Sequence, residues 1–546
     1  MQKLSRECCR PYIPPTSSID TRYSILDTNA QCPMPNSQFP IPNSKVTFIS
    51  ILYGLFLSGL LLAYWSAQKQ RSRLILLLIA SLIFYASLQI KYIPLLLLGT
   101  SINFYLGLGI SKNRQPRQSD LEDPNSSSSL TNPQETWNSR DLALFCLGII
   151  FNIFLLLGFK YVAFFLTVAG NLLNSPAALE LARWYGDNIK PPLGISFFSF
   201  ECISYLVDVY RGAPPSQNFL KFAVYKFFFP KLLSGPIARY HNFIRQLKTL
   251  HFPASHQLVE GLWLIACGAI KKGIVADRLA QFVNLCFDNL ERAGSGDLRL
   301  ATFAYGLQLY LDFSGYVDIA LGSALLLGFK LPQNFDFPYF TTSIAEFWRR
   351  WHISLGDWLR NYLYFPLGGS RKGLAITCLN LAIVMLVAGI WHGAAWGFIV
   401  WGALHGIALV VHRLVDTISG RFSQIDRWWQ SYLGTIVAWL LTQNMVFLSW
   451  IVFRLPDLKQ SGWVIQHLWG RSPDVQFTQK IYLETLGLMP FELCLLLIII
   501  AALMGCSYLF HKIFKLQLNW PIKILLVPLC FFAVLLFAPE NSTPFL

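Results

Sequence analysis

Residues 491–510 read FELCLLLIIIAALMGCSYLF, a run with a single charged side chain, Glu492, close to its start. About 20 apolar residues are needed for a helix to cross the hydrocarbon core of a bilayer, so this run predicts a membrane span. Similar apolar runs occupy 46–65, 74–88 and 142–159. Continuing along the chain gives roughly ten to thirteen spans, some of them short or interrupted. We therefore expect an all-α, polytopic integral membrane protein.

The overall composition supports the same class. Of the 546 residues, 54% are hydrophobic and 13% are charged, whereas soluble domains carry about 25% charged residues. The net charge of +15 is spread over loops between apolar runs. Such loops follow the positive-inside bias of membrane proteins, and we expect no nucleic-acid partner. Lys69, Arg71 and Arg73 directly follow the first run, which places that loop in the cytoplasm if the segment before Val46 lies outside.

Polar and broken segments divide the chain. Residues 1–45 are polar and proline-rich and are predicted to be disordered. Residues 111–140 form a low-complexity polar loop. Between about 191 and 373 the apolar runs are interrupted by proline, glycine and charge, which a membrane tolerates only inside protein or along a wet cavity. The membrane domain 46–546 is thus expected to contain N-terminal spans (46–110 and 141–190), a core that performs the function (191–413) and C-terminal spans (414–546).

The stretch GIWHGAAWGF, residues 389–398, places His392 inside an apolar run. An ionisable group inside a membrane is costly and by default marks a functional site. Gly389, Gly393 and Gly397 are spaced by four and favour a close helix crossing. In the alternative interpretation His392 only forms a hydrogen bond with a neighbour at that crossing. His405 lies too far round a continuous helix to share a metal with His392.

The segment EFWRRWHISLGDWLRNYLYFPLGGSRKG, residues 346–373, contains His352 among aromatic and basic side chains. This composition predicts an amphipathic segment at the membrane interface, with a simple interfacial anchor as the alternative. Glu346 and Arg350 are spaced to form an ion pair on a helix. The end of the segment lacks the spacing of a phosphate-binding P-loop, although Arg371 and Lys372 are suited to phosphates. Candidates for substrate or donor binding are Arg349, Arg350, Trp391, Asn361, Arg371 and Lys372.

Other catalytic patterns are absent from the sequence. It contains no G-x-S-x-G, no H-E-x-x-H and no G-x-G-x-x-G, which argues against a serine hydrolase, a zincin and a dinucleotide enzyme. None of the 11 cysteines forms a C-x-x-C pair. We therefore predict no metal site and no disulfide framework.

The two histidine motifs together resemble a known family. EFWRRWHISLGDWLRNYLYFPLGG followed by GIWHGAAWGFIVWGALHG strongly resembles the membrane-bound O-acyltransferase family. The likeness is to its bacterial branch, which modifies alginate and teichoic acid, and it is closer to the alginate-acetylation type. It runs from about Val46 to Gly406. The resemblance implies a helical ring, thinned at its centre, with a tunnel that links the two membrane faces. It also implies that His392 of the W-H-G motif is catalytic and that His352 of the R-W-H-I-S-L motif is a second functional position.

The resemblance further implies a reaction. An acetyl group would pass from a cytosolic thioester, either acetyl-CoA or an acyl carrier protein, toward an exported polysaccharide or a periplasmic partner acetyltransferase. The protein would lie in the lipid of the bacterial cytoplasmic (inner) membrane and would hold no bound cofactor. An imidazole titrates near neutrality, so His392 is predicted to be the general base. His352, Arg349 or the Trp391 N–H would stabilise the oxyanion.

Two other functions stay open at this level. One is D-alanyl transfer from a carrier protein to a cell-envelope polymer. The other is a non-catalytic transporter or polysaccharide channel, for which Asp312 and Asp318 would be the acidic pair. Because family members resemble this chain only from about Val46, we also expect residues 1–45 to be an extension from a misassigned start codon.

Overall fold

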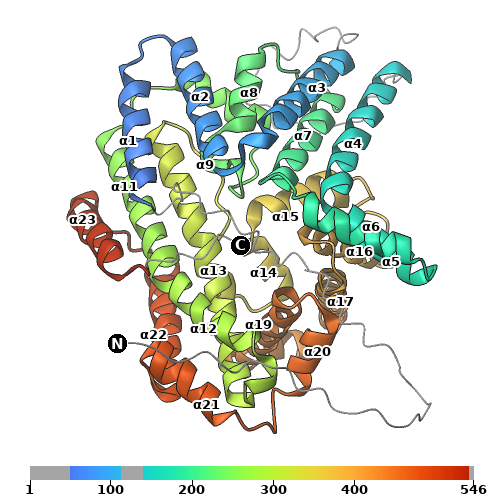
Figure 1. The fold of residues 1–546 in the computed structure, drawn as a ribbon, viewed down its shortest axis with the longest axis vertical. Coiled ribbons are helices and arrows are strands. Elements are labelled where there is room, and N and C mark those ends of the chain that lie inside the picture. The colour runs from blue at the N-terminus through green and yellow to red at the C-terminus, as the bar shows by residue number, and fades with distance from the viewer. Residues whose placement is uncertain (1–49, 112–138, 540–546) are drawn as a thin grey trace, which may run out of the picture. The chain divides into compact units, whose positions relative to one another are not determined.

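The computed structural model describes residues 50–111 and 139–539, and every regular element within those ranges is a helix (Figure 1). An isolated antiparallel bridge joins Phe335 to Trp351. Several of the helices are long and apolar enough to cross a membrane. The prediction of an all-α, polytopic membrane protein is therefore confirmed. The predicted disordered segment 1–45 and nearly all of the predicted polar loop 111–140 lie outside the described residues.

Within residues 50–111 and 139–539, eight apolar helical segments have the length of a membrane span, and the first of them comprises α2 and α3. They are α2 and α3 (Gln70–Gln89 and Ile93–Ser111), α4 (Ser139–Lys160), α13 (Ser295–Leu326), α16 (Leu374–His392), α17 (Trp396–Ser419), α19 (Tyr432–Arg454), α22 (Pro490–Tyr508) and α23 (Trp520–Phe537). Two shorter apolar helices are α1 (Ile51–Ser66) and α5 (Val162–Leu172). The number of membrane crossings, the ring and the tunnel stay predictions.

The remaining helices are shorter, and most of them lie in the predicted core. They are α6 (Pro176–Asn188), α7 (Ile195–Tyr210), α8 (Phe219–Phe227), α9 (Phe229–Leu232), α10 (Tyr240–Arg245), α11 (Ser255–Ala269), α12 (Asp277–Phe287), α14 (Ile344–Arg350), α15 (Ile353–Leu359), α18 (Ser423–Gln430), α20 (Leu458–Gln466) and α21 (Val475–Thr478). The proline and glycine interruptions read from the sequence thus become short helices and connecting loops.

Helix α13 is the buried centre of this arrangement. Of the most apolar stretch of this helix, 78% is buried inside the protein, compared with 11% for α22 and for α23. Helix α11 packs closely against it, because a Cβ added to Gly322 would lie 2.4 Å from the Gly261 carbonyl oxygen. A Cβ on Gly268 would likewise lie 2.4 Å from the carbonyl oxygen of Gly315. Small residues therefore let the two backbones touch, as is common between membrane helices.

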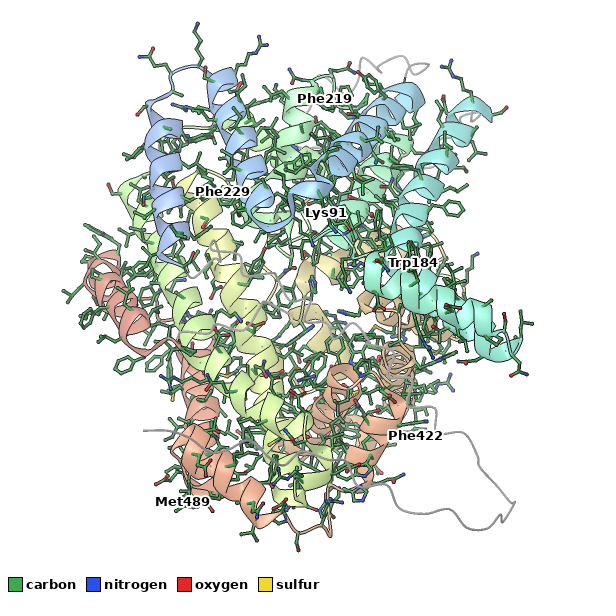
Figure 2. The ribbon with its side chains drawn as sticks, viewed as in Figure 1. Lys91, Trp184, Phe219, Phe229, Phe422 and Met489 are labelled. Carbon is green, nitrogen blue, oxygen red and sulfur yellow. The ribbon has the colours of Figure 1, made fainter. Side chains whose placement is uncertain are left out.

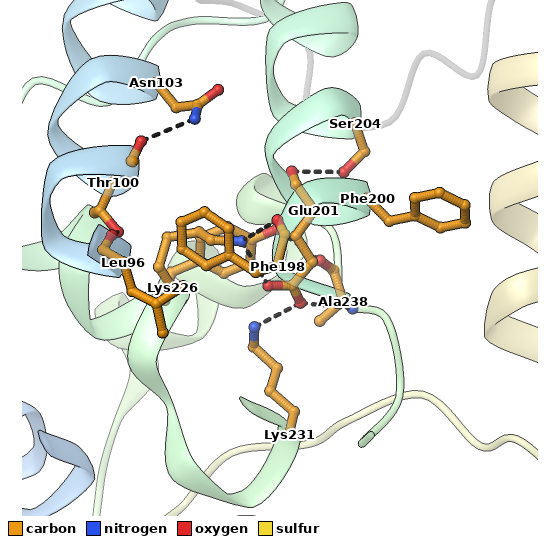
Figure 3. Close-up of polar contacts among 12 residues, drawn as sticks. Leu96, Thr100, Asn103, Phe198, Phe200, Glu201, Ser204, Lys226, Lys231 and Ala238 are labelled. Carbon is orange, nitrogen blue, oxygen red and sulfur yellow. Dashed lines mark hydrogen bonds and ion pairs between the residues drawn. The ribbon is translucent and has the colours of Figure 1, made fainter. Parts of the chain in front are cut away.

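The break between α8 and α9 is buried inside protein and is held by charge. Glu201 of α7 accepts hydrogen bonds from the ammonium groups of Lys226 (3.1 Å) and Lys231 (2.5 Å). All three side chains are at least nine-tenths buried (Figure 3). Phe229, in the broken segment, is completely buried among the packed helices, whereas Trp184 and Phe422 are more than half exposed (Figure 2). The irregular backbone is thus shielded, as a low-dielectric membrane requires.

Candidate active site

His392 is the last residue of α16, which ends there because the chain becomes extended at Gly393. A turn of three residues leads into α17, which returns against α16. A Cβ on Gly389 would lie 2.3 Å from the Phe398 carbonyl oxygen and 3.0 Å from the α-carbon of Gly402, so the predicted close helix crossing is present. The helix is not continuous through His392, which differs from the geometry assumed for the comparison with His405.

The His392 imidazole lies in an aromatic surround and is only partly buried. Its ring centroid is 4.9 Å from that of Trp391, 5.0 Å from Phe453 and 5.1 Å from Trp401. Among the residues that the structure describes, neither ring nitrogen has a hydrogen-bond partner. The alternative interpretation, in which His392 only bonds a neighbour at the helix crossing, therefore has no support. An imidazole whose nitrogens form no hydrogen bond with a neighbouring residue is available to exchange a proton.

His352 lies at the N-cap of α15 in the left-handed conformation, with φ of 44°. A left-handed backbone costs about 1–2 kcal/mol in any residue with a Cβ. Asn334, in the connection between α13 and α14, supports this conformation by accepting two hydrogen bonds. Its backbone carbonyl accepts from the Ile353 N–H (3.0 Å), and its Oδ1 accepts from the Ser354 N–H (3.1 Å). Strain that is held this firmly is a feature of functional sites.

The His352 ring is enclosed by apolar and aromatic side chains. Its centroid is 4.9 Å from that of Phe313 and 6.3 Å from those of Phe197 and Trp391. The residue lies outside the eight apolar segments of membrane-span length, and burial lowers the pKa of its imidazole to about 3. The ring is therefore neutral at physiological pH. Its buried Nδ1 has no hydrogen-bond partner in the described part of the chain.

Trp391 brings the two histidines into one site. His392 is next to it in sequence, and His352 meets the same indole from α15. The buried Nε1–H of Trp391 has no partner among the described residues. An unpaired buried donor costs about 1–3 kcal/mol. The geometry thus joins the three residues that the two sequence motifs singled out.

The backbone strain at His352 leads to a testable expectation. His352→Gly and His352→Ala should both lower activity by losing the imidazole, but the glycine variant should be more stable by about 1 kcal/mol, because glycine accepts a positive φ without a Cβ clash. Detergent-induced unfolding of the two purified variants measures this difference. At His241, inside α10, the order should reverse, since alanine is the better helix former. A His352→Ala protein as stable as His352→Gly would show that the backbone there is unstrained.

The other predicted binding residues do not reach the histidine pair. Arg350 forms the expected ion pair with Glu346 at 2.5 Å. The Asn361 amide donates to the Asp357 carbonyl oxygen at 2.6 Å. The remaining three are exposed: Arg349, Arg371 and Lys372. No hydrogen bond or ring contact joins any of these five to His352 or His392 in the described ranges.

The segment 346–373 is not a simple interfacial anchor. Phe347, Trp351 and Trp358 are buried within the protein, with at most 8% of each exposed. Farther along the chain, His405 has both ring nitrogens engaged, by the Trp348 indole N–H (3.3 Å) and the Ser449 hydroxyl (2.9 Å). A fully bonded, buried ring indicates a structural role for His405. No cluster of three or more metal-ligating side chains occurs in the described ranges.

A cavity of about 140 Å³ is lined in part by Ser354 and Trp358, which follow His352 along the chain. Its polar lining includes Arg239, Asn242, Gln246, Lys330, Ser354, Asp357 and Tyr362. Neither histidine lines the cavity, but Trp358 in its wall stacks on Phe200 at 3.8 Å. Phe200 in turn lies 5.4 Å from the Trp391 ring. One aromatic ring, that of Phe200, therefore lies between Trp358 in the cavity wall and the Trp391 indole.

The cavity wall is connected to the start of α2 through the residues around Gln246. Gln246 in its wall exchanges hydrogen bonds with the backbone of Lys330 at 2.7 and 3.0 Å. The neighbouring Leu247 carbonyl accepts from Gln70, the first residue of α2, which stands between Lys69 and Arg71. These basic residues are among those that the positive-inside bias assigns to the cytoplasm.

Sequence reasoning missed Lys160 and Tyr161. Both side chains donate to carbonyl groups in the last turn of α16, from Lys160 to Trp391 and from Tyr161 to Ile390. The only signal in the sequence is a lysine that directly follows the apolar run 142–159. Contacts between residues more than two hundred positions apart do not follow from local pattern.

Comparison with known proteins shows the family to which the chain belongs. The profile described as MBOAT, membrane-bound O-acyltransferase family, matches residues 192–451, which include both histidines and Trp391. Together with the relatives below, this shows that the chain belongs to the membrane-bound O-acyltransferase family and is an O-acyltransferase.

Curated relatives narrow the type of enzyme. The chain is 36% identical to a probable alginate O-acetylase AlgI of Pseudomonas syringae pv. tomato, over 76% of this chain and 72% of that protein. It is 35% identical to the peptidoglycan O-acetyltransferase of Helicobacter pylori, over 72% and 73%. The teichoic acid D-alanyltransferase of Bacillus subtilis is more distant, at 26% identity over 49% and 69%.

Proposed function

We propose that this protein moves an acetyl group from a cytosolic thioester toward a hydroxyl of an exported polysaccharide, or of a periplasmic partner acetyltransferase, in the bacterial inner membrane. The observation that carries the proposal is the convergence of His392 and His352 on the Trp391 indole, in a chain similar to polysaccharide O-acetylases. The names of those relatives support a polysaccharide acceptor, whereas the periplasmic partner and the inner-membrane location are inferred from the resemblance to the bacterial branch of the family.

The chemistry follows from the protonation state that each group can hold. A neutral His392 takes the proton of the acceptor hydroxyl as that oxygen attacks the thioester carbonyl carbon. The carbon–sulfur bond then breaks, and the imidazolium returns the proton to the departing sulfur. The Trp391 N–H and the His352 ring each have a buried nitrogen that no described residue engages, and these groups are available to stabilise the oxyanion. Burial keeps the His352 ring neutral, so its proposed role is to orient the substrate or to polarise the thioester carbonyl.

The basic cavity is suited to the donor. Its Arg239 guanidinium packs over the Tyr362 ring at 5.4 Å, and the Tyr362 hydroxyl donates to Asp208 at 2.9 Å. An arginine fixed in this way is suited to bind a phosphate. The position on the predicted cytoplasmic face favours acetyl-CoA, or the phosphopantetheine arm of a carrier protein, entering from that side.

Purified protein in liposomes tests the function and its donor. We expect acetyl transfer to polysaccharide, or to a partner acetyltransferase, from radiolabelled acetyl-CoA or from an acetyl-loaded carrier protein, each supplied alone. Transfer of D-alanine and not of acetyl from the carrier would replace the proposal with the D-alanyl function. No transfer of either group would overturn both.

The proposed donor site makes a separate prediction. Arg239→Gln should raise KM for acetyl-CoA about tenfold, because a charge-assisted phosphate contact contributes roughly 1.5 kcal/mol. Its KM for acetyl-pantetheine, which lacks the phosphates, should be unchanged. Arg371→Gln is the matched control, since Arg371 is exposed outside the cavity. If KM increased in Arg371→Gln alone, the donor site would instead lie at the turn that contains Gly368, Gly369 and Arg371.

The transporter or channel alternative has little support in the charges of α13. Asp312 pairs with Lys272 at 2.5 Å, and Asp318 pairs with Lys271 at 2.7 Å. Asp208 accepts from Tyr362. Carboxylates held by fixed partners are poor candidates for binding a transported ion.

A further inference from the structure

The end of α4 meets the end of α16 at the candidate active site. The Lys160 ammonium donates to the Trp391 carbonyl oxygen and lies 3.5 Å from the Ser196 hydroxyl. It also lies over the Trp391 indole, 5.7 Å from the ring centroid. The adjacent Tyr161 hydroxyl donates to the Ile390 carbonyl oxygen at 2.5 Å. Two consecutive side chains thus bind two consecutive carbonyl groups that immediately precede His392.

These carbonyl groups need partners from outside their own helix. The last four carbonyls of an α-helix have no intrahelical donor, and α16 stops at His392 because Gly393 is extended. Aligned peptide dipoles also place about half a negative charge at a helix C-terminus, where a cation is favourable. The Lys160 ammonium supplies both a donor and a positive charge at this position.

Lys160 is an unusual residue for a purely mechanical role. It follows the apolar run 142–159, and its side chain is only partly exposed. Tyr161 already supplies an uncharged cap to the same helix end. A second cap on an ionisable residue, in an environment where a charge is costly, indicates a role beyond capping the helix.

We propose that Lys160 is a positioning residue for His392: its ammonium fixes the carbonyl end of α16, so that the imidazole and the Trp391 N–H are held in one orientation beside a fixed positive charge. This inference rests on the proposed acetyl transfer for its kinetic test. The proton transfers stay with His392, and Lys160 acts through the helix end to which it is bound.

Kinetics of three substitutions separate hydrogen bonding from charge. Lys160→Met removes both and should lower kcat about 10- to 100-fold with KM for the donor changed less than twofold, because small displacements of a catalytic group cost rate more than binding. Lys160→Arg should recover kcat to within about fivefold of wild type, since charge and donors return. Lys160→Gln, a donor without charge, should stay slower than Lys160→Arg, and an equal kcat for the two variants would overturn the role proposed for the charge.

Lys190 provides a matched control. Its ammonium donates to the Gly186 carbonyl oxygen at 3.0 Å, so it also caps a helix end, but on the exposed helix α6. Lys190→Met should leave kcat unchanged. Lys160→Met with kcat within twofold of wild type would overturn the proposal. A folded Lys160→Arg protein as slow as Lys160→Met would also overturn it.

A spectroscopic measurement keeps the proposal testable if acetyl transfer is not the reaction. In protein labelled with ¹⁵N-histidine, the ring signals of His392 are assigned by their loss in His392→Ala. Lys160→Met should shift these signals, and Lys190→Met should not. Unchanged His392 signals in Lys160→Met would refute the positioning role, whereas absence of acetyl transfer by the wild-type protein would refute only the proposed function.

Discussion

Replacing His392 with alanine should lower the rate of acetyl transfer about a thousandfold while leaving a folded protein in the membrane. The imidazole is the proposed general base, and such a group contributes roughly 10²- to 10⁴-fold to a rate. Folding should survive, because the ring is partly exposed and forms no hydrogen bond with another described residue. The measurement is single-turnover transfer by purified protein in liposomes, normalised to the amount of folded protein.

His412 supplies the control for His392. It lies on α17, is partly exposed, and has no ring contact with Trp391 among the described residues. His412→Ala should therefore retain wild-type transfer. Near-normal transfer by His392→Ala would remove the proposed mechanism, whereas loss of transfer in both variants with loss of folded protein would point to a structural role for these helices.

Much of the fold could be predicted from apolar length alone. The run 142–159 lies within α4, and the run 491–510 corresponds closely to α22. Both predictions succeed because the bilayer sets the length of a spanning helix. The broken middle third was also expected, since proline and glycine end helices locally. Its burial inside protein follows from the cost of exposing backbone groups to lipid.

The site could be predicted only in part. The motif resemblance selected His392, His352 and Trp391, which the structure brings together. The break after His392 was not expected, because a single extended glycine inside an apolar run has no distinct pattern. The left-handed backbone of His352 is supported by Asn334, which lies in the connection between α13 and α14. Such conformations are imposed by tertiary contacts, which periodicity does not report.

Long-range partners explain the remaining misses. The contacts of Lys160 with α16 and of Glu201 with two lysines join helices that are distant in sequence. A pattern of apolar residues indicates which positions are buried, but not which helix covers them. The candidate donor cavity could not be predicted for the same reason. Its wall combines residues from α7, from the loop before α10, from the connection after α13 and from the segment that begins at α15.

The second large effect is expected at Glu201, where alanine should destabilise the protein by about 3–5 kcal/mol. The carboxylate is the shared partner of Lys226 and Lys231, whose side chains are 0% and 1% exposed. Its loss leaves two buried ammonium groups without an anion, and an unpaired buried charge costs far more than a pair contributes. Detergent-induced unfolding of the purified protein measures the change in free energy.

Asp318→Ala is the matched control for Glu201→Ala, because it also removes the carboxylate of a lysine ion pair. Lys271, its partner, is 33% exposed and can be hydrated, so this variant should lose about 1 kcal/mol or less. A triple change of Glu201, Lys226 and Lys231 to methionine should recover most of the stability lost in Glu201→Ala, since no charge then remains buried. Equal losses in Glu201→Ala and Asp318→Ala would contradict the argument. Glu201 also accepts the Ala238 N–H at 3.4 Å, next to Arg239, so the stable triad holds the wall of the candidate donor cavity.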